Sequence, residues 1–225
     1  MRPAAGPGRA GVVAVLVPAL FLAGGCAATR QALRGEEARA ASGFFAAAAV
    51  PFPVVASFSG SAEISGRTVP LVAGVNSRAP DNETVGIYDP LGRAVLFLDN
   101  AGGEVSVTRG PAAGEYLAGR LRRIPDGEVV VRADGFSLGR VLAGVPGFPV
   151  ADGRAGRTAE GAWVLEDGPQ TLFTDPSRRV LARAEYEIAG KRIAVSYPGR
   201  EEGGPPRTVT IEVRGARMTL RRDAE

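Results

Sequence analysis

Side chains that could carry covalent or acid–base chemistry are sparse in this sequence. Histidine is absent and cysteine occurs once, at Cys26, which excludes an imidazole base, histidine metal ligands and a Ser-His-Asp triad. Carboxylate pairs such as Glu201 with Glu202, or Asp167 with Asp175, lie in or beside turn-rich stretches, where we expect them to be solvated. No glycine-rich phosphate-binding motif precedes a predicted helix. We therefore predict that the protein is not an enzyme and needs no cofactor or metal.

The N-terminal residues are typical of a secretory signal. Arg2 and Arg9 form a short positive region, and the apolar stretch 10–22 follows it. The 13 residues of this stretch are fewer than the roughly 20 that a helix needs to span a bilayer. We predict that residues 1–25 are a signal peptide.

Cys26 is best explained as a lipidation site. A secreted protein with one cysteine cannot form an internal disulfide, so the thiol needs another role. The small residues before Cys26 resemble a bacterial lipobox, although Ala23 stands where leucine is usual and Leu22 precedes it. We expect acyl chains on Cys26; an ordinary signal peptide followed by a stray cysteine is the alternative. The next residue is Ala27 rather than aspartate, which resembles lipoproteins sent to the bacterial outer membrane and held on its periplasmic face.

The charge balance argues against nucleic acid as a partner. Without Arg2 and Arg9 the chain has 25 basic residues against 24 acidic ones, a net charge of about +1. Phosphate backbones are bound by clustered surplus positive charge, and none remains after this subtraction. We expect a monomer that binds no nucleic acid.

A hairpin is predicted around Asp89-Pro90-Leu91-Gly92. The flanking residues Val85, Ile87 and Val95 to Leu98 read as strands. Aspartate, proline and glycine suit the first, second and fourth positions of a β-turn. Leu91 is left at the outermost point, where it either folds back onto the sheet or is held out into something other than water.

Residues 86–107 resemble outer-membrane lipoprotein insertases of the LolB type. The resemblance rests on Tyr88 to Gly92, the apolar strand after it, and the stretches 100–103 and 104–107. More widely, the chain resembles the LolA/LolB fold, an unclosed β-barrel with a helical lid. The resemblance implies that Leu91 inserts into the membrane, and that acylated cargo comes from a periplasmic lipoprotein carrier.

The remaining pattern is mainly β. The 31 glycines and 17 prolines indicate many turns, and period-two alternation from Val54 onward predicts about eleven strands. Helices are expected within 27–49, over 111–121 and over 138–145, the last capped by Ser137 and similar to a lid helix of the resembled family. We predict an unclosed antiparallel β-barrel over 51–225 with a small helical lid, joined to the lipid anchor by a tether and first helix over 26–50.

The apolar faces of these elements suggest a ligand site. We expect acyl chains of lipids or lipoproteins to contact twelve residues: Phe58, Ile64, Val85, Ile87, Leu96, Leu98, Leu138, Val141, Leu142, Val145, Tyr186 and Ile193. The resulting hypothesis is an outer-membrane lipoprotein that delivers other lipoproteins. Two alternatives stay open: a lipid carrier of the same fold, and a structural envelope lipoprotein that docks to a complex by its sheet edge and has no cavity.

Lipidation can be tested at Cys26. Intact-mass analysis of the mature protein should find a diacylated, amine-blocked N-terminus at this residue. Cys26→Ser should leave the protein unprocessed or soluble, because the acceptor thiol is gone. A free thiol at Cys26 in the wild-type protein would contradict the assignment.

Overall fold

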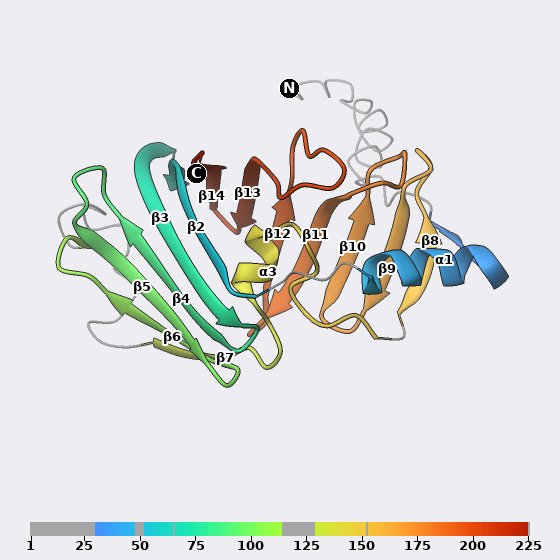
Figure 1. Cartoon of the computed structure of the whole chain (residues 1–225), viewed down its shortest axis with the longest axis horizontal. Helices are drawn as coiled ribbons and strands as arrows, with labels where there is room; N and C mark the ends of the chain where they lie inside the picture. Colours follow the sequence, from blue (N-terminus) through green and yellow to red (C-terminus); the bar gives the residue numbers. More distant parts are fainter. Residues whose placement is uncertain (1–29, 48–51, 65, 114–128, 152, 225) are drawn as a thin grey trace, which may run out of the picture.

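The computed structural model describes residues 30–47, 52–64, 66–113, 129–151 and 153–224. Within them, 14 strands form one antiparallel sheet in the order β1-β8-β9-β10-β11-β12-β13-β14-β2-β3-β4-β5-β6-β7. The sheet curls strongly but does not close, because β1 and β7 remain its two edges (Figure 1). This confirms the predicted unclosed antiparallel barrel. The signal peptide, Cys26 and most of the helix expected over 111–121 lie outside the described residues.

The strands fall into two runs along the chain. The first run is β1 Gln31–Ala32, β2 Val54–Ile64, β3 Arg67–Ala79, β4 Asn82–Tyr88, β5 Ala94–Ala101, β6 Glu104–Arg109 and β7 Val129–Arg132. The second run is β8 Arg154–Arg157, β9 Trp163–Asp167, β10 Gln170–Thr174, β11 Leu181–Ile188, β12 Lys191–Ser196, β13 Thr208–Val213 and β14 Ala216–Arg222. The runs join where β14 pairs with β2, so the last strand completes the sheet beside one of the first.

Two short strands were not expected from the sequence. β1 pairs only with β8, in the register Gln31 with Arg157 and Ala32 with Gly156, and β8 in turn pairs with β9. Neither segment alternates apolar and polar residues, which is the sequence signal for a half-buried strand. Their pairing depends on the neighbouring strand in space, so local pattern could not indicate it.

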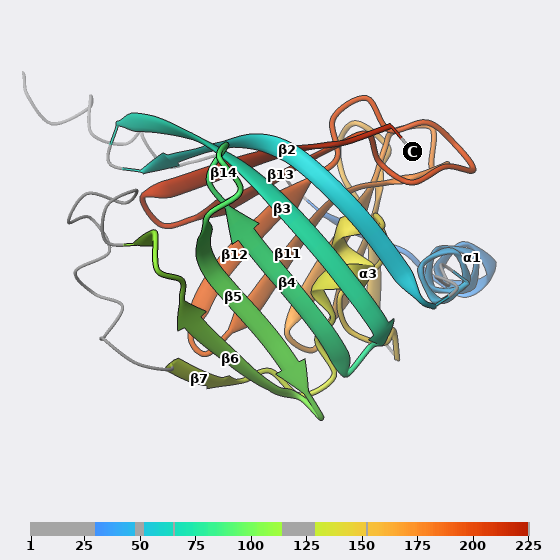
Figure 2. The ribbon, with the colours of Figure 1, turned by 60° about the vertical axis from the view of Figure 1, so that its left-hand side comes forward.

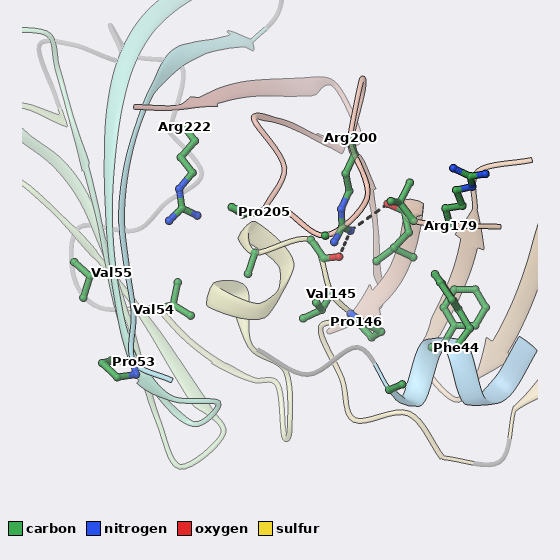
Figure 3. A pocket seen from close by; sticks show the side chains of 18 residues that line it. Phe44, Pro53, Val54, Val55, Val145, Pro146, Arg179, Arg200, Pro205 and Arg222 are labelled. Atoms are coloured by element: carbon green, nitrogen blue, oxygen red, sulfur yellow. Dashed lines mark hydrogen bonds between the residues drawn. The ribbon is translucent and has the colours of Figure 1, made fainter. Parts of the chain in front are cut away.

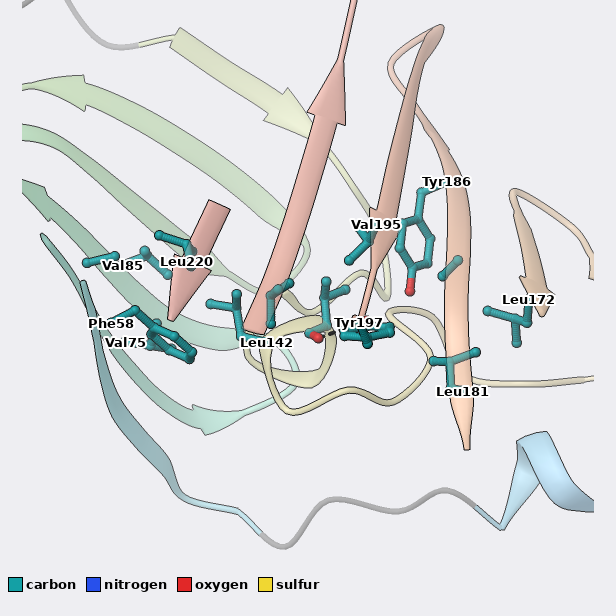
Figure 4. Close-up of a cluster of buried hydrophobic side chains, with 14 of the residues drawn as sticks. Phe58, Val75, Val85, Leu142, Leu172, Leu181, Tyr186, Val195, Tyr197 and Leu220 are labelled. Atoms are coloured by element: carbon teal, nitrogen blue, oxygen red, sulfur yellow. Dashed lines mark hydrogen bonds between the residues drawn. The ribbon is translucent and has the colours of Figure 1, made fainter. Parts of the chain in front are cut away.

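The concave face of the sheet carries the core. In β3 the buried residues alternate as Leu71, Ala73, Val75 and Ser77, the period that puts every second side chain on one face. Figure 4 shows labelled side chains of this core from β2, β3, β4, β11, β12 and β14.

Helix α1, Gly35–Ala46, packs on β8 and β9, and its Phe45 joins the core cluster (Figure 1). Its buried residues are Ala41 and Phe45, which are four residues apart and therefore lie on one face of the helix. Phe44 meets the Trp163 ring edge to face, with ring centroids 6.1 Å apart. Neither α1 nor any other helix among the described residues is long and apolar enough to cross a bilayer.

Helix α3, Leu138–Leu142, lies inside the curved sheet, behind β2 to β4 in Figure 2. Ser137 is its N-cap, as the sequence predicts, and Ser137 Oγ accepts a hydrogen bond from Arg140 N at 3.0 Å. The helix is only five residues long, too short to be stable without tertiary partners.

The main partner of α3 is Glu83 of β4, which is 2% exposed. The carboxyl group of Glu83 accepts hydrogen bonds from Leu138 N at 2.9 Å and Gly139 N at 3.0 Å. It also accepts from the hydroxyls of Ser77, at 2.8 Å, and Ser137. A β-carbon at position 139 would lie 2.6 Å from Ser77 Cβ, so only glycine fits there. One buried side chain thereby holds the start of α3 against the sheet.

Further hydrogen bonds hold the rest of the segment. Tyr197 Oη donates to Val141 O at 2.9 Å, and Tyr186 Oη accepts from Gly147 N at 3.1 Å. Burial raises the pKa of both tyrosines, so both stay neutral at physiological pH. The helix predicted as a lid is therefore fastened to β4, β11 and the end of β12 in this structure.

Removing the Glu83 carboxyl group should destabilise the protein. In Glu83→Ala, the two backbone donors of α3 and two hydroxyls lose their buried acceptor, and we expect the free energy of unfolding to fall by about 3 kcal/mol. Urea unfolding measures this. Glu187→Ala, which removes an exposed carboxyl group from β11, is the control and should change stability by about 0.5 kcal/mol at most. Equal effects of the two substitutions would show that Glu83 does not anchor α3.

Candidate functional site

A cavity of about 310 Å³ lies between α3 and the concave face of the sheet. Its size is at the lower end of the range for small-molecule sites. Val85, Leu142, Tyr186, Val195 and Leu220, all labelled in Figure 4, are part of its wall. With few exceptions the lining side chains are aliphatic or aromatic, so the cavity is suited to hydrocarbon.

Nine of the twelve predicted ligand-contacting residues line this cavity. They are Val85, Ile87, Leu96, Leu98, Leu138, Val141, Leu142, Tyr186 and Ile193. The structure brings them together from β4, β5, α3, β11 and β12. Contact with a ligand itself stays a prediction for each of them.

Three predicted residues, Phe58, Ile64 and Val145, do not line the cavity. Phe58 is buried in the packed core. Ile64, at the far end of β2, packs against the small cluster of Val95, Ala112 and Ala113. Val145 follows α3 and faces a different hollow. Alternation identifies the face on which Phe58 and Ile64 lie but not their height along the barrel. Val145 was expected on a helix over 138–145, but α3 ends at Leu142, so Val145 leaves the face that Leu138 and Val141 share.

Several lining residues were missed by the sequence reasoning. They come mainly from β6 and from the closing strands: Val105, Val107, Ile188, Val195, Ile211, Val213, Met218 and Leu220, with Phe136 beside α3. Ile211 and Val213, like Met218 and Leu220, are spaced by two residues, so same-face alternation was the available signal. Which of these same-face residues line the cavity, rather than packed core, depends on how the whole sheet curls.

The polar groups in the cavity wall already have partners. Besides Glu83 and Tyr186, the wall contains Asn100, whose Nδ2 donates to Phe136 O at 3.0 Å. Asn100 Oδ1 accepts from Gly103 N at 3.2 Å. These groups stabilise α3 and the adjoining turns, and the surface they leave for a ligand is apolar.

The cavity runs from α3 toward the hairpin at Asp89. Glu83 pairs with Asn100 at the α3 end, and Ile87 pairs with Leu96 at the hairpin end. The strand pairings from β13 across β14, β2 and β3 to β4 place Val213 at the hairpin end of the sheet as well. Its side chain lines the cavity and is 38% exposed. The cavity therefore reaches solvent at the end opposite α3.

The Asp89 turn is closed by hydrogen bonds and its tip is apolar. Asp89 is buried, and its Oδ1 accepts from Leu91 N at 3.0 Å and Arg93 N at 2.9 Å. Arg93 Nε donates to Asp89 Oδ2 at 2.7 Å, Gly92 N donates to Asp89 O at 2.9 Å, and Gly92 has φ +77°. Leu91 is 80% exposed, so it does not fold back onto the sheet. The exposure of Leu91 does not test its role in membrane insertion, which stays a prediction.

Among the described residues, no group of three or more His, Cys, Asp or Glu side chains is placed to hold a metal ion.

No protein-family model matches the chain. No curated protein matches it either. Among solved structures, the chain is similar to the crystal structure of LolA superfamily protein NE2245 from Nitrosomonas europaea. The two share 12% sequence identity with a TM-score of 0.45, over 83% of this chain and 91% of that chain. The resemblance to LolB-type insertases stays a prediction.

Because of the Asp89 turn, the free energy of unfolding should depend on pH in the acidic range. Burial favours the neutral carboxyl group, but hydrogen bonds from the Arg93 backbone and guanidinium, and from Leu91 N, outweigh burial and hold the pKa of Asp89 below its ordinary value of 3.8. A lowered folded-state pKa adds stability that is fully present above the unfolded-state pKa and is lost as pH falls through the folded-state pKa.

The difference in unfolding free energy between wild type and Asp89→Asn, measured by urea unfolding, should therefore be constant above about pH 5 and shrink as the solution is acidified below pH 4. A difference that grows on acidification would contradict this account.

Proposed function

We propose that this protein binds an acyl chain of a lipid or lipoprotein in the apolar cavity between α3 and the sheet. The observation that carries the proposal is the cavity itself, with its aliphatic lining and its satisfied polar groups. Burial of each methylene contributes about 0.8 kcal/mol, so even part of one chain would be held firmly. A space of about 310 Å³ accommodates such a segment without rearrangement of the wall.

The finer proposal is that the protein is an outer-membrane lipoprotein that delivers acylated cargo to the membrane. Leu91 supports it, because this side chain is held 80% exposed at the hairpin beside the solvent-reaching end of the cavity. An exposed leucine gains about 1.5–3 kcal/mol when it enters hydrocarbon. In this proposal Cys26 carries the anchor, a periplasmic carrier supplies the cargo, and Leu91 leads the chain into the bilayer.

A carrier that binds lipid without inserting lipoproteins is the second candidate, since it needs the same cavity but not Leu91. The structural lipoprotein without a ligand is less well supported, because a filled core would be expected there and the described residues enclose a cavity instead.

Filling the cavity should weaken ligand binding. Val107 lines the cavity, and Val107→Trp places a large ring in the space that a chain would occupy. We expect affinity for a fluorescent fatty acid, measured by titration with purified protein lacking residues 1–26, to fall about tenfold, equivalent to 1.4 kcal/mol.

The matched control is Val130→Trp, since Val130 on β7 is 51% exposed and does not line the cavity. Its affinity should equal that of the wild type. Unchanged affinity in Val107→Trp, with both variants folded, would place the ligand elsewhere.

Substitution of Leu91 can distinguish a protein that inserts lipoproteins into the membrane from one that only carries lipid. Leu91→Glu should leave the melting temperature nearly unchanged, because the side chain makes few core contacts, and should leave fatty-acid uptake intact. Transfer of an acylated protein from the loaded variant to liposomes should be blocked, while Leu91→Phe, which keeps an apolar tip, should retain it. Normal transfer by a stable Leu91→Glu variant would favour the simple carrier.

A further inference from the structure

The apolar cavity between α3 and the sheet is closed at the α3 end. Glu83 and Asn100, which pair across β4 and β5, are 2% and 3% exposed there. Asn100 Nδ2 donates to Phe136 O at 3.0 Å, and Ala133 N donates to Gly103 O at 3.0 Å. These hydrogen bonds tie the segment before α3 to β5 and the turn after it, so a ligand cannot pass this end unless they break.

The cavity does not continue past the residues that follow α3. Ala143 to Pro146 line a second hollow of about 780 Å³ (Figure 3). Arg200 Nη1 donates to Gly144 O and, at 3.3 Å, to Leu181 O, and these contacts link the segment after α3 to β11. The hollow and the cavity share no lining residue among the described ones, so the two spaces are separate.

The other end of the cavity is open. Val213 is 38% exposed and lines the cavity there. Ile87 and Leu96, the lining pair nearest to the hairpin on β4 and β5, are half-buried. An apolar chain can therefore enter from this end without movement of α3.

The distance between the two ends follows from the strands. Asn100 at the closed end and Leu96 at the open end are four residues apart on β5, and the pairing with β4 is regular between them. A strand rises about 3.4 Å per residue, so these positions are roughly 14 Å apart. An extended hydrocarbon chain advances about 1.3 Å per carbon, because bonds of about 1.5 Å zigzag along it. The cavity is therefore about eleven carbons long.

The volume of the cavity gives a similar limit. A methylene group occupies roughly the 30 Å³ of a water molecule in the liquid. The cavity volume of about 310 Å³ therefore holds about ten methylenes. One chain of this length fills the space and leaves no room for a second chain beside it.

The closed end has no free partner for the polar head of a lipid. The carboxyl group of Glu83 already accepts hydrogen bonds from two backbone amides and two hydroxyls. Asn100 uses both its amide nitrogen and its carbonyl oxygen, and Tyr186 Oη accepts from Gly147 N. A carboxylate or phosphate placed there would lose water without gaining a partner, which is costly. The head is therefore favoured at the open end, where water remains.

We propose that the protein binds one acyl chain tail-first through the Val213 end, and that the closed α3 end limits the buried segment to about ten carbons. The head, and the rest of any longer chain, stay outside the cavity. This inference rests on the proposed function and adds to it a direction of entry and a chain-length limit.

The length limit is tested by displacing the fluorescent fatty acid with octanoate, decanoate, dodecanoate and hexadecanoate, each below the concentration at which it aggregates. The protein lacks residues 1–26 and keeps every described element. Affinity should rise about fourfold per carbon up to decanoate, as burial of a methylene predicts. From dodecanoate to hexadecanoate it should rise less than about tenfold, whereas burial of the added methylenes would raise it about 200-fold. A larger rise over this interval would overturn the length limit.

The substitution Ala133→Leu tests the position of the closed end. Ala133 lines the cavity there and is 6% exposed, so a larger side chain should shorten the cavity from that side. Dodecanoate should bind this variant at least about tenfold more weakly than the wild type, while octanoate should bind it within about twofold. The matched control is Ala101→Leu, since Ala101 is exposed at the end of β5 and does not line the cavity. It should bind both acids like the wild type.

Equal effects of Ala133→Leu on the two acids, or no effect on either, would contradict a closed end at this residue. The length series on the wild type needs no variant, so it decides the chain-length limit even if Ala133→Leu does not fold.

The direction of entry is tested with the ω-hydroxy derivative of dodecanoate. Tail-first binding places its terminal hydroxyl against the closed end, where the polar groups of the wall already have partners. It should therefore bind the wild type at least about tenfold more weakly than dodecanoate, and equal affinities would overturn tail-first binding. If no chain of the series bound, the proposed function would fail and this inference with it. If the chains bound but affinity kept rising to hexadecanoate, the proposed function would stand and the length limit alone would fail.

Discussion

A single carboxyl group joins the sheet to its inner helix. Glu83 on β4 accepts hydrogen bonds from the first backbone donors of α3 and from two serine hydroxyls, while it is almost fully removed from water. A buried polar group is tolerated only when its partners are complete, so the position of α3 and the burial of Glu83 depend on each other. Without this contact a helix of one and a half turns would have little reason to form.

The placement of α3 divides the interior into two spaces of different chemistry. Toward β4, β5 and β11 to β14 the segment closes an apolar cavity that opens near Val213. Toward α1 and the loop after β12, the residues that follow α3, Ala143 to Pro146, line a second hollow. From the opposite side of the curl, Tyr186 and Tyr197 form hydrogen bonds with the backbone of the α3 segment. The segment from Leu138 to Pro146 thus borders both hollows, α3 on one side and the residues after it on the other.

Prediction from sequence succeeded where the signal was local. The Asp89 turn formed as its residue types indicate, with the aspartate side chain bonded to Leu91 N and glycine at positive φ. Ser137 capped α3 as expected. The assignment of lining residues was less complete: Val85 and Ile87 were correctly placed on the concave face, whereas Phe58 shares that face but lies in packed core.

The sequence by itself determined most of the strands, with their apolar faces, and the Asp89 turn, because backbone preferences and period-two alternation act over a few residues. Tertiary structure alone decided the pairing of β1 with β8, the burial of Glu83 and the meeting of residues from β4, β5, α3, β11 and β12 at one cavity. These features join residues far apart in the chain. Their positions follow from the curl and register of the whole sheet, a property that no short stretch of sequence contains.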